Sequence, residues 1–351
     1  MNVDLASAEI RTQVQLALER ITVIPQLAGK HLLITGATGF FGKWLLAVIA
    51  GMNAQGAEIA VTAVSRSPER FLAQYPQYRH VGWMTWLQGD VRALASLKLV
   101  RAPDLILHAA TDTSAAGQAD GLQTFDTIVE GARSVLELAE RTRARRVLFT
   151  GSGAQYGPLT SGAPVREDDF QGCDSASADS AYAEAKRAQE LLAALFARQH
   201  GIDVILTRCF AFAGPGLSLD GHFAIGNFVR DALTREELIL NSSGQSVRSY
   251  LYAGDLVIWL LTLLIVGQSG QAYNVGSDQA LTIAELARKV LERIAPHKPL
   301  RILGSPDSGP ARSWYVPDIQ KARGLGLDVW TSLDRSIDSM AAWVREQRSF
   351  D

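Results

Sequence analysis

The chain has 351 residues, of which 47% are apolar and 20% are charged, with 30 Gly and 12 Pro. This composition is typical of a globular α/β protein with one large or two smaller domains, and it excludes a disordered chain, a collagen and a coiled coil. The formal net charge of −2 supplies no cationic surface, so we expect neither nucleic acid nor an anionic membrane as a partner.

The sequence also indicates the compartment. Cys173 and Cys209 are too few for a disulfide framework, and the N-terminal residues contain no apolar signal segment. The uncharged run 256–267 is shorter than the ~20 residues that a membrane-spanning helix needs. We therefore predict a cytoplasmic protein in which 256–267 is a buried helix.

Apolar periodicity predicts the secondary structure in chain order. Residues 6–22 have helical spacing and form part of an N-terminal extension, residues 1–28. After Lys30, short apolar runs alternate with helical patterns. The predicted strands are 31–35, 58–65, 85–89, 105–108, 146–150 and 204–207, and the predicted helices are 41–52, 121–142 and 182–200. This alternation predicts an α/β fold of the Rossmann type, a doubly wound parallel sheet covered on both faces.

The pattern becomes less regular after Phe210, where a Gly/Pro cluster occupies 214–216. This change predicts a smaller C-terminal lobe that binds substrate. The expected dinucleotide-binding domain, which holds the sheet, comprises 29–212, and 249–277 returns to it. The expected lobe comprises 213–248 and 278–351.

A glycine-rich turn follows the first predicted strand. Gly36, Gly39 and Gly42 open the next helix, and such a turn lets a dinucleotide pyrophosphate approach the helix N-terminus. A P-loop needs four residues between its glycines and then Lys-Ser or Lys-Thr. Here five residues separate Gly36 from Gly42, and Trp44 follows Lys43. The turn therefore indicates a dinucleotide site, and matching features downstream disfavour an ordinary strand–helix turn.

The end of the second strand indicates which dinucleotide binds. NAD sites place Asp or Glu there on the ribose 2′-hydroxyl, whereas this chain has Ser65 and Arg66. A guanidinium suits a 2′-phosphate, so we favour NADP over NAD; the alternative is that Arg66 is a solvated surface charge. Asp90, at the end of the third strand, could meet the adenine amino group or be an ordinary strand-end residue.

Tyr182 and Lys186 are four residues apart on a predicted helix, and therefore share one face. A nearby ammonium lowers the pKa of a phenol, so the pair could transfer protons. Ser152 follows a strand whose C-terminal end is expected to line the ligand crevice, where its hydroxyl could bind a substrate oxygen. Alone, the pair could be a surface pair and Ser152 a turn residue.

These motifs together resemble the extended short-chain dehydrogenase/reductases, the superfamily of NAD(P)-dependent sugar-nucleotide epimerases and dehydratases. The resemblance runs from about residue 30 to the C-terminus. Its motifs are TGATGFFG at 35–42, GDV at 89–91, LHAA at 107–110, TGSGAQYG at 150–157, YAEAK at 182–186, RSYLYAGD at 248–255 and YNVGS at 273–277.

The resemblance implies roles for individual residues. Ser152, Tyr182 and Lys186 would be catalytic, and Arg248 would hold the substrate diphosphate with Asn227 nearby. The expected cofactor contacts are Gly36, Thr38, Gly39, Phe40, Phe41, Gly42, Ser65, Arg66, Asp90, Val91, Ala109, Ala110, Thr111, Tyr182 and Lys186. Relatives form a homodimer through the helix that corresponds to 121–142, although a fully buried crossover helix would show the same apolar pattern.

Departures from the family pattern narrow the expected reaction. The 4,6-dehydratases carry Asp and Glu as the acid and base of elimination where this chain has Gly153 and Ala154. Ala211 and Ile128 stand where relatives frequently have Asn, which bears on the substrate. Gly153 and Ala154 have no proton to give or take, which disfavours elimination. We therefore expect a 4-epimerase or 4-ketoreductase that transfers a hydride at C4 of a nucleotide-linked hexose. The alternatives are a sugar-nucleotide dehydratase, a reductase of a lipophilic alcohol or ketone, which Arg248 argues against, and a non-catalytic dinucleotide sensor.

The six histidines show no metal-ligand spacing, so we expect no metal site. His108 is interpreted as a structural hydrogen-bonding residue. No G-x-S-x-G motif occurs, which argues against an α/β-hydrolase role for Ser152.

Overall fold

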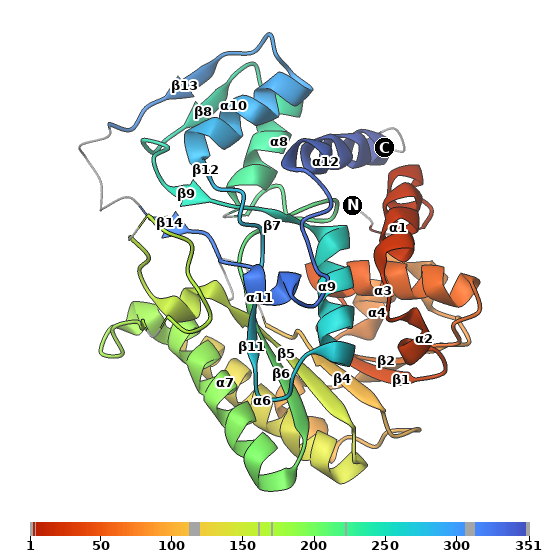
Figure 1. Cartoon of the computed structure of the whole chain (residues 1–351). Helices are drawn as coiled ribbons and strands as arrows, with labels where there is room; N and C mark the ends of the chain where they lie inside the picture. Colours follow the sequence, from red (N-terminus) through yellow and green to blue (C-terminus); the bar gives the residue numbers. More distant parts are fainter. Residues whose placement is uncertain are drawn as a thin grey trace.

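Seven parallel strands form the central sheet of the computed structural model, which describes residues 3, 5–111, 120–160, 162–169, 171–221, 223–305 and 313–348. The strand order is β11-β6-β5-β4-β1-β2-β3 (Figure 1). The bounds are β1 His31–Thr35, β2 Ala60–Ser65, β3 Met84–Gln88, β4 Leu105–His108, β5 Arg146–Ser152, β6 Asp203–Cys209 and β11 Ala272–Val275.

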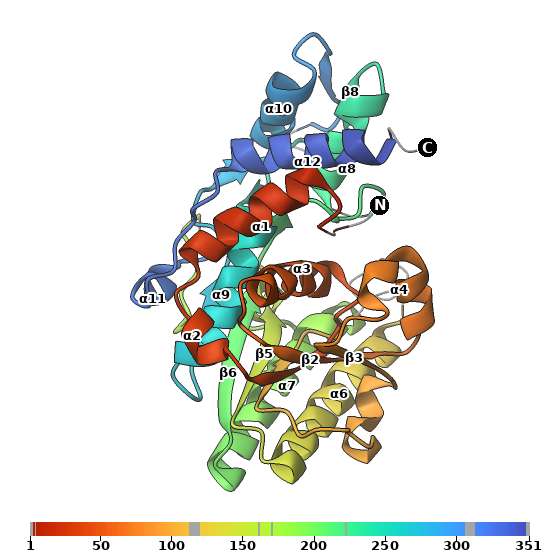
Figure 2. The same ribbon diagram turned by 90° about the vertical axis from the view of Figure 1, so that its right-hand side faces the viewer.

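Alternate side chains of the strands enter two separate apolar clusters, one on each face of the sheet. Leu32 and Ile34 pack in the cluster that contains α3 (Phe40–Ala54) and α9 (Ala253–Val266), whereas Leu33 packs with α6 (Gly121–Thr142) and α7 (Ala181–His200). Strands buried on both faces are typical of parallel sheets between helical layers. Figure 2 shows the two layers edge-on. The predicted doubly wound fold is confirmed.

The six predicted strands are all present, with ends displaced by up to two residues. The predicted helix 121–142 has the bounds of α6, and the run 256–267 lies within buried α9 except for its last residue. No prediction named a strand at 272–275, where β11 pairs with β6 at the sheet edge. A strand of four residues is too short to show a clear period of its own.

The C-terminal lobe, at the top of Figure 1, combines short helices with two small sheets. Its helices are α8 Ala224–Thr234, α10 Ile283–Ile294 and α12 Leu333–Arg348, and its strands are β8 Leu238–Leu240, β9 Val247–Arg248, β12 Leu281–Thr282, β13 Leu300–Ile302 and β14 Trp314–Tyr315. β14 pairs with β9 so that Tyr315 lies beside Arg248. The short pair β7 Phe212–Ala213 and β10 Leu251–Tyr252 connects the lobe to the main sheet.

The N-terminal extension forms α1 (Ala8–Arg20) and the short α2 (Ile24–Leu27), and α1 contacts α3, α9 and α12. Arg20 pairs with the buried Asp255 carboxylate at 3.3 Å. Asp255 also accepts hydrogen bonds from the Thr331 backbone N–H (2.8 Å) and hydroxyl (3.0 Å). The extension is therefore fastened to α9 and to the segment that precedes α12.

This cluster predicts a pH-dependent stability. Burial raises the pKa of Asp255 from 3.8 to about 6, although its hydrogen bonds and Arg20 act in the opposite direction. The folded state then holds this proton more tightly than the unfolded state, so stability should fall by about 2 to 3 kcal/mol as pH rises from about 4 to about 6. Asp255→Asn should remove this component. Urea unfolding of both proteins between these pH values tests it, and equal pH dependences would contradict the prediction.

Candidate active site

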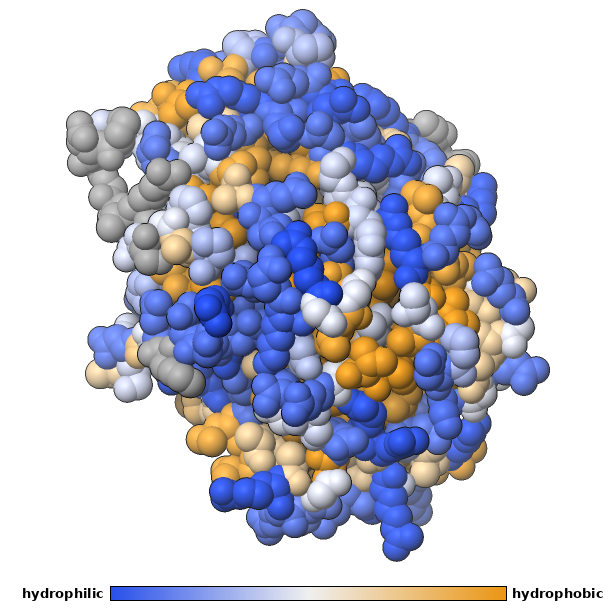
Figure 3. Space-filling view, viewed as in Figure 1, coloured by the Kyte–Doolittle hydropathy of each residue, from blue (hydrophilic) through white to orange (hydrophobic). Residues whose placement is uncertain are grey.

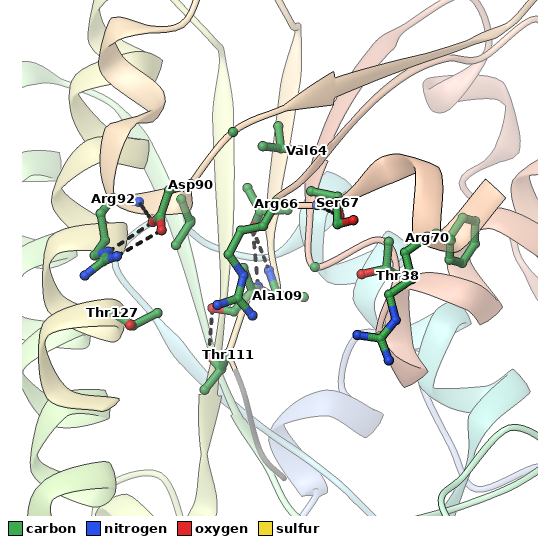
Figure 4. Close-up of a pocket in the computed structure, with 18 of the residues that line it drawn as sticks. Thr38, Val64, Arg66, Ser67, Arg70, Asp90, Arg92, Ala109, Thr111 and Thr127 are labelled. Carbon is green, nitrogen blue, oxygen red and sulfur yellow. Dashed lines mark hydrogen bonds and ion pairs between the residues drawn. The ribbon is translucent and has the colours of Figure 1, made fainter. Parts of the chain in front are cut away.

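A cavity of about 500 Å³ opens at the carboxyl ends of β1, β2 and β4 (Figure 4). This is the edge of a doubly wound sheet at which ligands bind. Its lining includes ten of the predicted cofactor residues: Gly36, Thr38, Gly39, Ser65, Arg66, Asp90, Val91, Ala109, Ala110 and Thr111. The cavity thus brings together residues from the ends of several strands.

The glycine-rich turn brings the backbone close to this cavity. Gly36 has φ +75°, and a Cβ on it would lie 2.5 Å from the Ala109 carbonyl oxygen. Gly42 packs against Ala37, where a Cβ would lie 2.3 Å from Cα. Gly39 is the N-cap of α3 and lines the cavity. The turn therefore fits a pyrophosphate held by the backbone at a helix N-terminus.

Five predicted cofactor residues do not line the cavity: Phe40, Phe41 and Gly42, and also Tyr182 and Lys186, which are described below. Phe41 instead packs edge-on against Phe212, with ring centroids 5.0 Å apart, and Phe40 lies in the same apolar cluster. Gly42 acts through the close approach of helix and strand. Phe40, Phe41 and Gly42 therefore pack the glycine-rich turn against the rest of the protein, and none of them is a lining residue of the cavity.

The cavity wall carries mostly positive charge. Its cationic side chains are Lys43, Arg66, Arg70 and Arg92, and its carboxylate, among the described lining residues, is Asp90. Arg92 holds Asp90 through two hydrogen bonds of 3.0 Å, and this pairing lowers the Asp90 pKa. Arg66 and Arg70 are exposed and flank the cavity from β2 and α4 (Pro68–Gln74) in Figure 4. This charge favours an anionic ligand.

Ser152 at the end of β5 and Tyr182 and Lys186 on α7 lie close to the cavity, which Lys186 contacts through Thr111. Ser152 ends β5, and its hydroxyl accepts a hydrogen bond from the Ala154 N–H at 3.2 Å. Burial raises the pKa of Tyr182, and a hydrogen bond with Ser152 partly offsets this effect. The structure therefore brings the predicted serine and tyrosine together.

Lys186 follows Tyr182 by one helical turn on α7 and is buried. Its ammonium donates to Thr111 Oγ1 (2.8 Å), to the Thr150 carbonyl (2.8 Å) and to Gln189 Oε1 (3.3 Å). Burial lowers its pKa to about 8. Tyr182 and Lys186 are not among the lining residues of the cavity, but Thr111 is, so Thr111 connects Lys186 to the cavity.

The Gln155 side chain holds the backbone of Ser152 in place. Its Oε1 accepts from the Ser152 N–H at 2.9 Å, and its amide donates to Glu190 at 2.8 Å. Glu190 pairs in turn with Arg208 at 2.6 Å. This chain of contacts fastens the end of β5 to α7 and β6, which fixes the serine relative to the helix that carries Tyr182.

A model of the NAD dependent epimerase/dehydratase family matches residues 32–276. The chain belongs to this family. UDP-glucuronic acid decarboxylase 6 of Arabidopsis thaliana is 34% identical over 204 residues, 58% of this chain and 57% of that protein. The match thus spans less than two thirds of that relative's length. A dTDP-glucose 4,6-dehydratase of Streptomyces griseus is 24% identical over 328 residues, 91% of this chain and 95% of that protein.

Solved members of the epimerase/dehydratase fold superpose on most of the chain. UDP-glucose 4-epimerase of Thermotoga maritima, solved with UDP-glucose, has a TM-score of 0.77 at 20% identity and covers 91% of this chain and 99% of that one. The dTDP-glucose 4,6-dehydratase of Bacillus anthracis, in complex with NAD, has a TM-score of 0.76 at 18% identity and covers 92% and 98%. These likenesses show the fold.

The two predicted substrate residues of this family member lie in the C-terminal lobe. Arg248 donates to the Val247 carbonyl (2.8 Å) and the Ser313 hydroxyl (3.2 Å) and lies 5.6 Å from the Tyr315 ring centroid. Asn227 donates to the Gly221 carbonyl at 3.0 Å, and its buried Oδ1 has no hydrogen-bond partner among the described residues. A buried amide oxygen without a partner is consistent with a polar ligand group.

His108 was interpreted as a structural hydrogen-bonding residue, and its Nδ1 lies 2.8 Å from the Thr35 hydroxyl. Burial lowers its pKa to about 3, which keeps the ring neutral. No group of three or more potential metal ligands occurs in the described parts of the chain. Nor does any helix there have the length and apolar character to cross a bilayer.

Sequence reasoning missed several residues around the site. Lys43 directly follows the glycine-rich turn and Arg70 lies four residues after Arg66, so both had a local signal. Gln189 lies three residues after Lys186 on the same helix face. Tyr315, whose ring packs against Phe210 and whose hydroxyl lies beside Gly153, had no local signal at all.

Proposed function

We propose that the protein is an enzyme that oxidises and reduces C4 of the hexose of a sugar nucleotide, as a 4-epimerase or 4-ketoreductase, with NADP preferred over NAD. The observation that carries this proposal is the placement of Ser152 beside Tyr182, with Lys186 one helical turn after Tyr182 and hydrogen-bonded to Thr111 of the cavity wall. A non-catalytic sensor would have no need of this arrangement.

Ser152, Tyr182 and Lys186 each have a separate role in the proposed proton transfer. When bound, the nicotinamide dinucleotide supplies the site that accepts and returns the hydride. Tyr182 takes the proton from the sugar hydroxyl or returns it to the carbonyl oxygen, and Ser152 holds that oxygen. The Lys186 ammonium favours the ionised form of Tyr182, because an opposite charge nearby lowers the pKa of a phenol.

The crowding around Gly153, next to Ser152, argues against a reaction that eliminates water. The 4,6-dehydratases that the chain resembles carry their acid at the position of Gly153. Here a Cβ on Gly153 would lie 2.7 Å from the Tyr315 hydroxyl and 2.8 Å from the Phe210 ring. An aspartate would require both rings to move, so these neighbours support a reaction without loss of water.

The charge of the cavity supports NADP. Arg66, Arg70 and Lys43 line it, whereas the one carboxylate among its described lining residues, Asp90, is paired with Arg92. A 2′-phosphate would meet positive groups at this end of the cavity. The solved dehydratase with NAD shows that the fold also accepts the other dinucleotide.

A substrate panel tests the proposed reaction. Purified protein is incubated with NADP or NADPH and UDP-, dTDP-, GDP- and CDP-hexoses and 4-keto sugars, and products are followed by NMR and mass spectrometry. We expect a change of configuration or a reduction at C4 with the nucleotide intact. Turnover only of substrates without a nucleotide would refute the proposal.

A decarboxylase or dehydratase is the second candidate, because relatives of 34% and 24% identity bear those names. The same panel with UDP-glucuronic acid added distinguishes it, since loss of water or of carbon dioxide lowers the mass of the sugar, whereas epimerisation leaves it unchanged and reduction adds two hydrogens.

We further propose a homodimer through α6 and α7. Leu122, Leu191 and Leu195 on these helices are 74%, 63% and 43% exposed. Exposed leucines on adjacent helices are typical of an interface. Leu191→Glu with Leu195→Glu should convert the dimer to a monomer in sedimentation experiments, whereas Leu303→Glu, an exposed leucine of the other lobe, should not. A monomeric wild type would contradict this.

A further inference from the structure

The buried Lys186 ammonium is held by neutral oxygens. Its three hydrogen bonds go to Thr111 Oγ1 and the Thr150 carbonyl oxygen, both at 2.8 Å, and to Gln189 Oε1 at 3.3 Å. An ammonium has three N–H donors, so each of them has an acceptor. The charge of Lys186 is therefore stabilised by hydrogen bonds to uncharged groups, and each of these acceptors matters to it.

The titratable groups that face this ammonium supply no anion near neutral pH. They are Tyr182 on the same helix face, Cys209 on β6 and His108 on β4. Burial raises the pKa of the Cys209 thiol to about 11 and lowers that of His108 to about 3, so both are neutral at pH 7. The phenol of Tyr182 becomes the counter-ion of Lys186 when it loses its proton.

Gln189 follows Lys186 by three residues on α7 and is 1% exposed. Its Oε1 accepts from the ammonium, and its Nε2 donates to the Thr150 carbonyl at 3.2 Å. A reversed amide would turn N–H groups toward a cation, so the charge of Lys186 selects this orientation. Gln189, Lys186 and the Thr150 carbonyl thus form a closed set of three hydrogen bonds.

We propose that Gln189 is a positioning residue that keeps Lys186 charged and fixed against the Thr150 carbonyl. A buried cation has lost its hydration, and a hydrogen bond to a charged group is stronger than one between neutral groups. Removing one acceptor therefore favours release of the proton from Lys186. This inference rests on the proposed function of Tyr182, because Lys186 favours the ionised phenol only while it carries its charge.

Lys186 and Tyr182 titrate as a pair. When the pair holds one proton, that proton lies either on the amine or on the phenol, and the first arrangement alone provides the base for proton transfer. The Gln189 acceptor favours the first arrangement. Gln189→Met should therefore lower kcat about three- to tenfold at neutral pH, with KM within about twofold, because Gln189 acts through Lys186 and not on the substrate.

The pH dependence of unfolding tests the same variant without any reaction. Burial lowers the pKa of Lys186 from 10.5 to about 8, so the folded state binds this proton less tightly than the unfolded state. The charge of Lys186 then reduces stability, fully below about pH 8 and less as the pH rises toward 10.5. In Gln189→Met the pKa should fall by about one further unit. Relative to the wild type, its unfolding constant in urea should be about tenfold larger at pH 6 than at pH 9.

Two control variants isolate the contribution of Lys186. On a Lys186→Met background, adding Gln189→Met should change the unfolding constant by the same factor at pH 6 and at pH 9. Gln13→Met removes another buried amide, bonded to Glu9 at 2.8 Å on α1, and should leave the pH dependence of the wild type unchanged. Groups that titrate equally in all variants cancel from these comparisons.

Gln189→Glu predicts the opposite sign. It places a carboxylate beside the ammonium and so favours the charged lysine. This variant should gain stability relative to the wild type as the pH falls from 9 to 7. It also decides the question if Gln189→Met does not fold, since the absence of this gain would refute the proposal.

A loss of stability in Gln189→Met that is equal at pH 6 and pH 9, or the same pH dependence in Gln13→Met, would overturn the proposal. An unchanged kcat in Gln189→Met would overturn its effect on Tyr182. If no sugar nucleotide reacts, or if Tyr182→Phe retains full turnover, the proposed function fails, while the unfolding series still decides whether Gln189 keeps Lys186 charged.

Discussion

Replacing Tyr182 by phenylalanine should reduce turnover by about 10² to 10⁴, the usual effect of removing a general acid or base. In the proposed mechanism the phenol exchanges a proton with the sugar oxygen, and the buried Lys186, with its pKa lowered to about 8, cannot replace it at that position. Dissociation constants for NADP and NADPH should stay within about twofold, because Tyr182 is not among the residues that line the cavity. Single-turnover rates and cofactor fluorescence measure the two quantities separately.

Tyr252→Phe serves as the control, since it deletes a buried phenol hydroxyl that is bonded to the Ser339 hydroxyl at 3.0 Å, away from Ser152. Full turnover by Tyr182→Phe would remove Tyr182 from the mechanism. A parallel loss of cofactor affinity and melting temperature would instead assign Tyr182 a structural role.

The sequence predicted the sheet because its strands are buried on both faces and therefore appear as uninterrupted apolar runs. It predicted the glycine-rich turn because Gly36 and Gly42 stand where side chains would collide with Ala109 and Ala37. Both signals are local: a run of a few residues, or a fixed spacing, carries the information. Ser152 and Tyr182 were singled out by their places beside a strand and on a helix, together with the resemblance of the whole series of motifs to the family.

The parts that escaped prediction depend on contacts between distant segments. Tyr315 lies on a two-residue strand in the C-terminal lobe, and only the packing of that lobe brings it to Phe210 and Gly153. The support of Ser152 by Gln155, Glu190 and Arg208 combines three elements. No spacing within one element specifies such a network. The environment of Asp90 was missed for another reason, because its partner Arg92 is two residues away and outside any motif.

The double variant Arg66→Ala, Arg70→Ala should abolish the preference for NADP. Both guanidiniums line the cavity, one at the end of β2 and the other on α4. A hydrogen bond to a charged group contributes about 1.5 to 3 kcal/mol. Because both side chains are exposed, solvent screening places the free energy of each contact at the lower end of this range, which corresponds to about tenfold in affinity. NADP should therefore bind about tenfold more weakly to each single variant and about a hundredfold more weakly to the double variant.

NAD lacks the 2′-phosphate, so its dissociation constant should change by no more than about threefold in the same variants. The affinity of the wild type for NADP should also fall more steeply with salt than that of the double variant, because two cationic contacts are screened in one and absent in the other. Arg288→Ala, an exposed arginine on α10, controls for the loss of surface charge and should leave both affinities unchanged. Tighter binding of NAD than of NADP by the wild type would refute the proposed preference. Arg66 and Arg70 would then be solvated charges that line the cavity without affecting which dinucleotide binds.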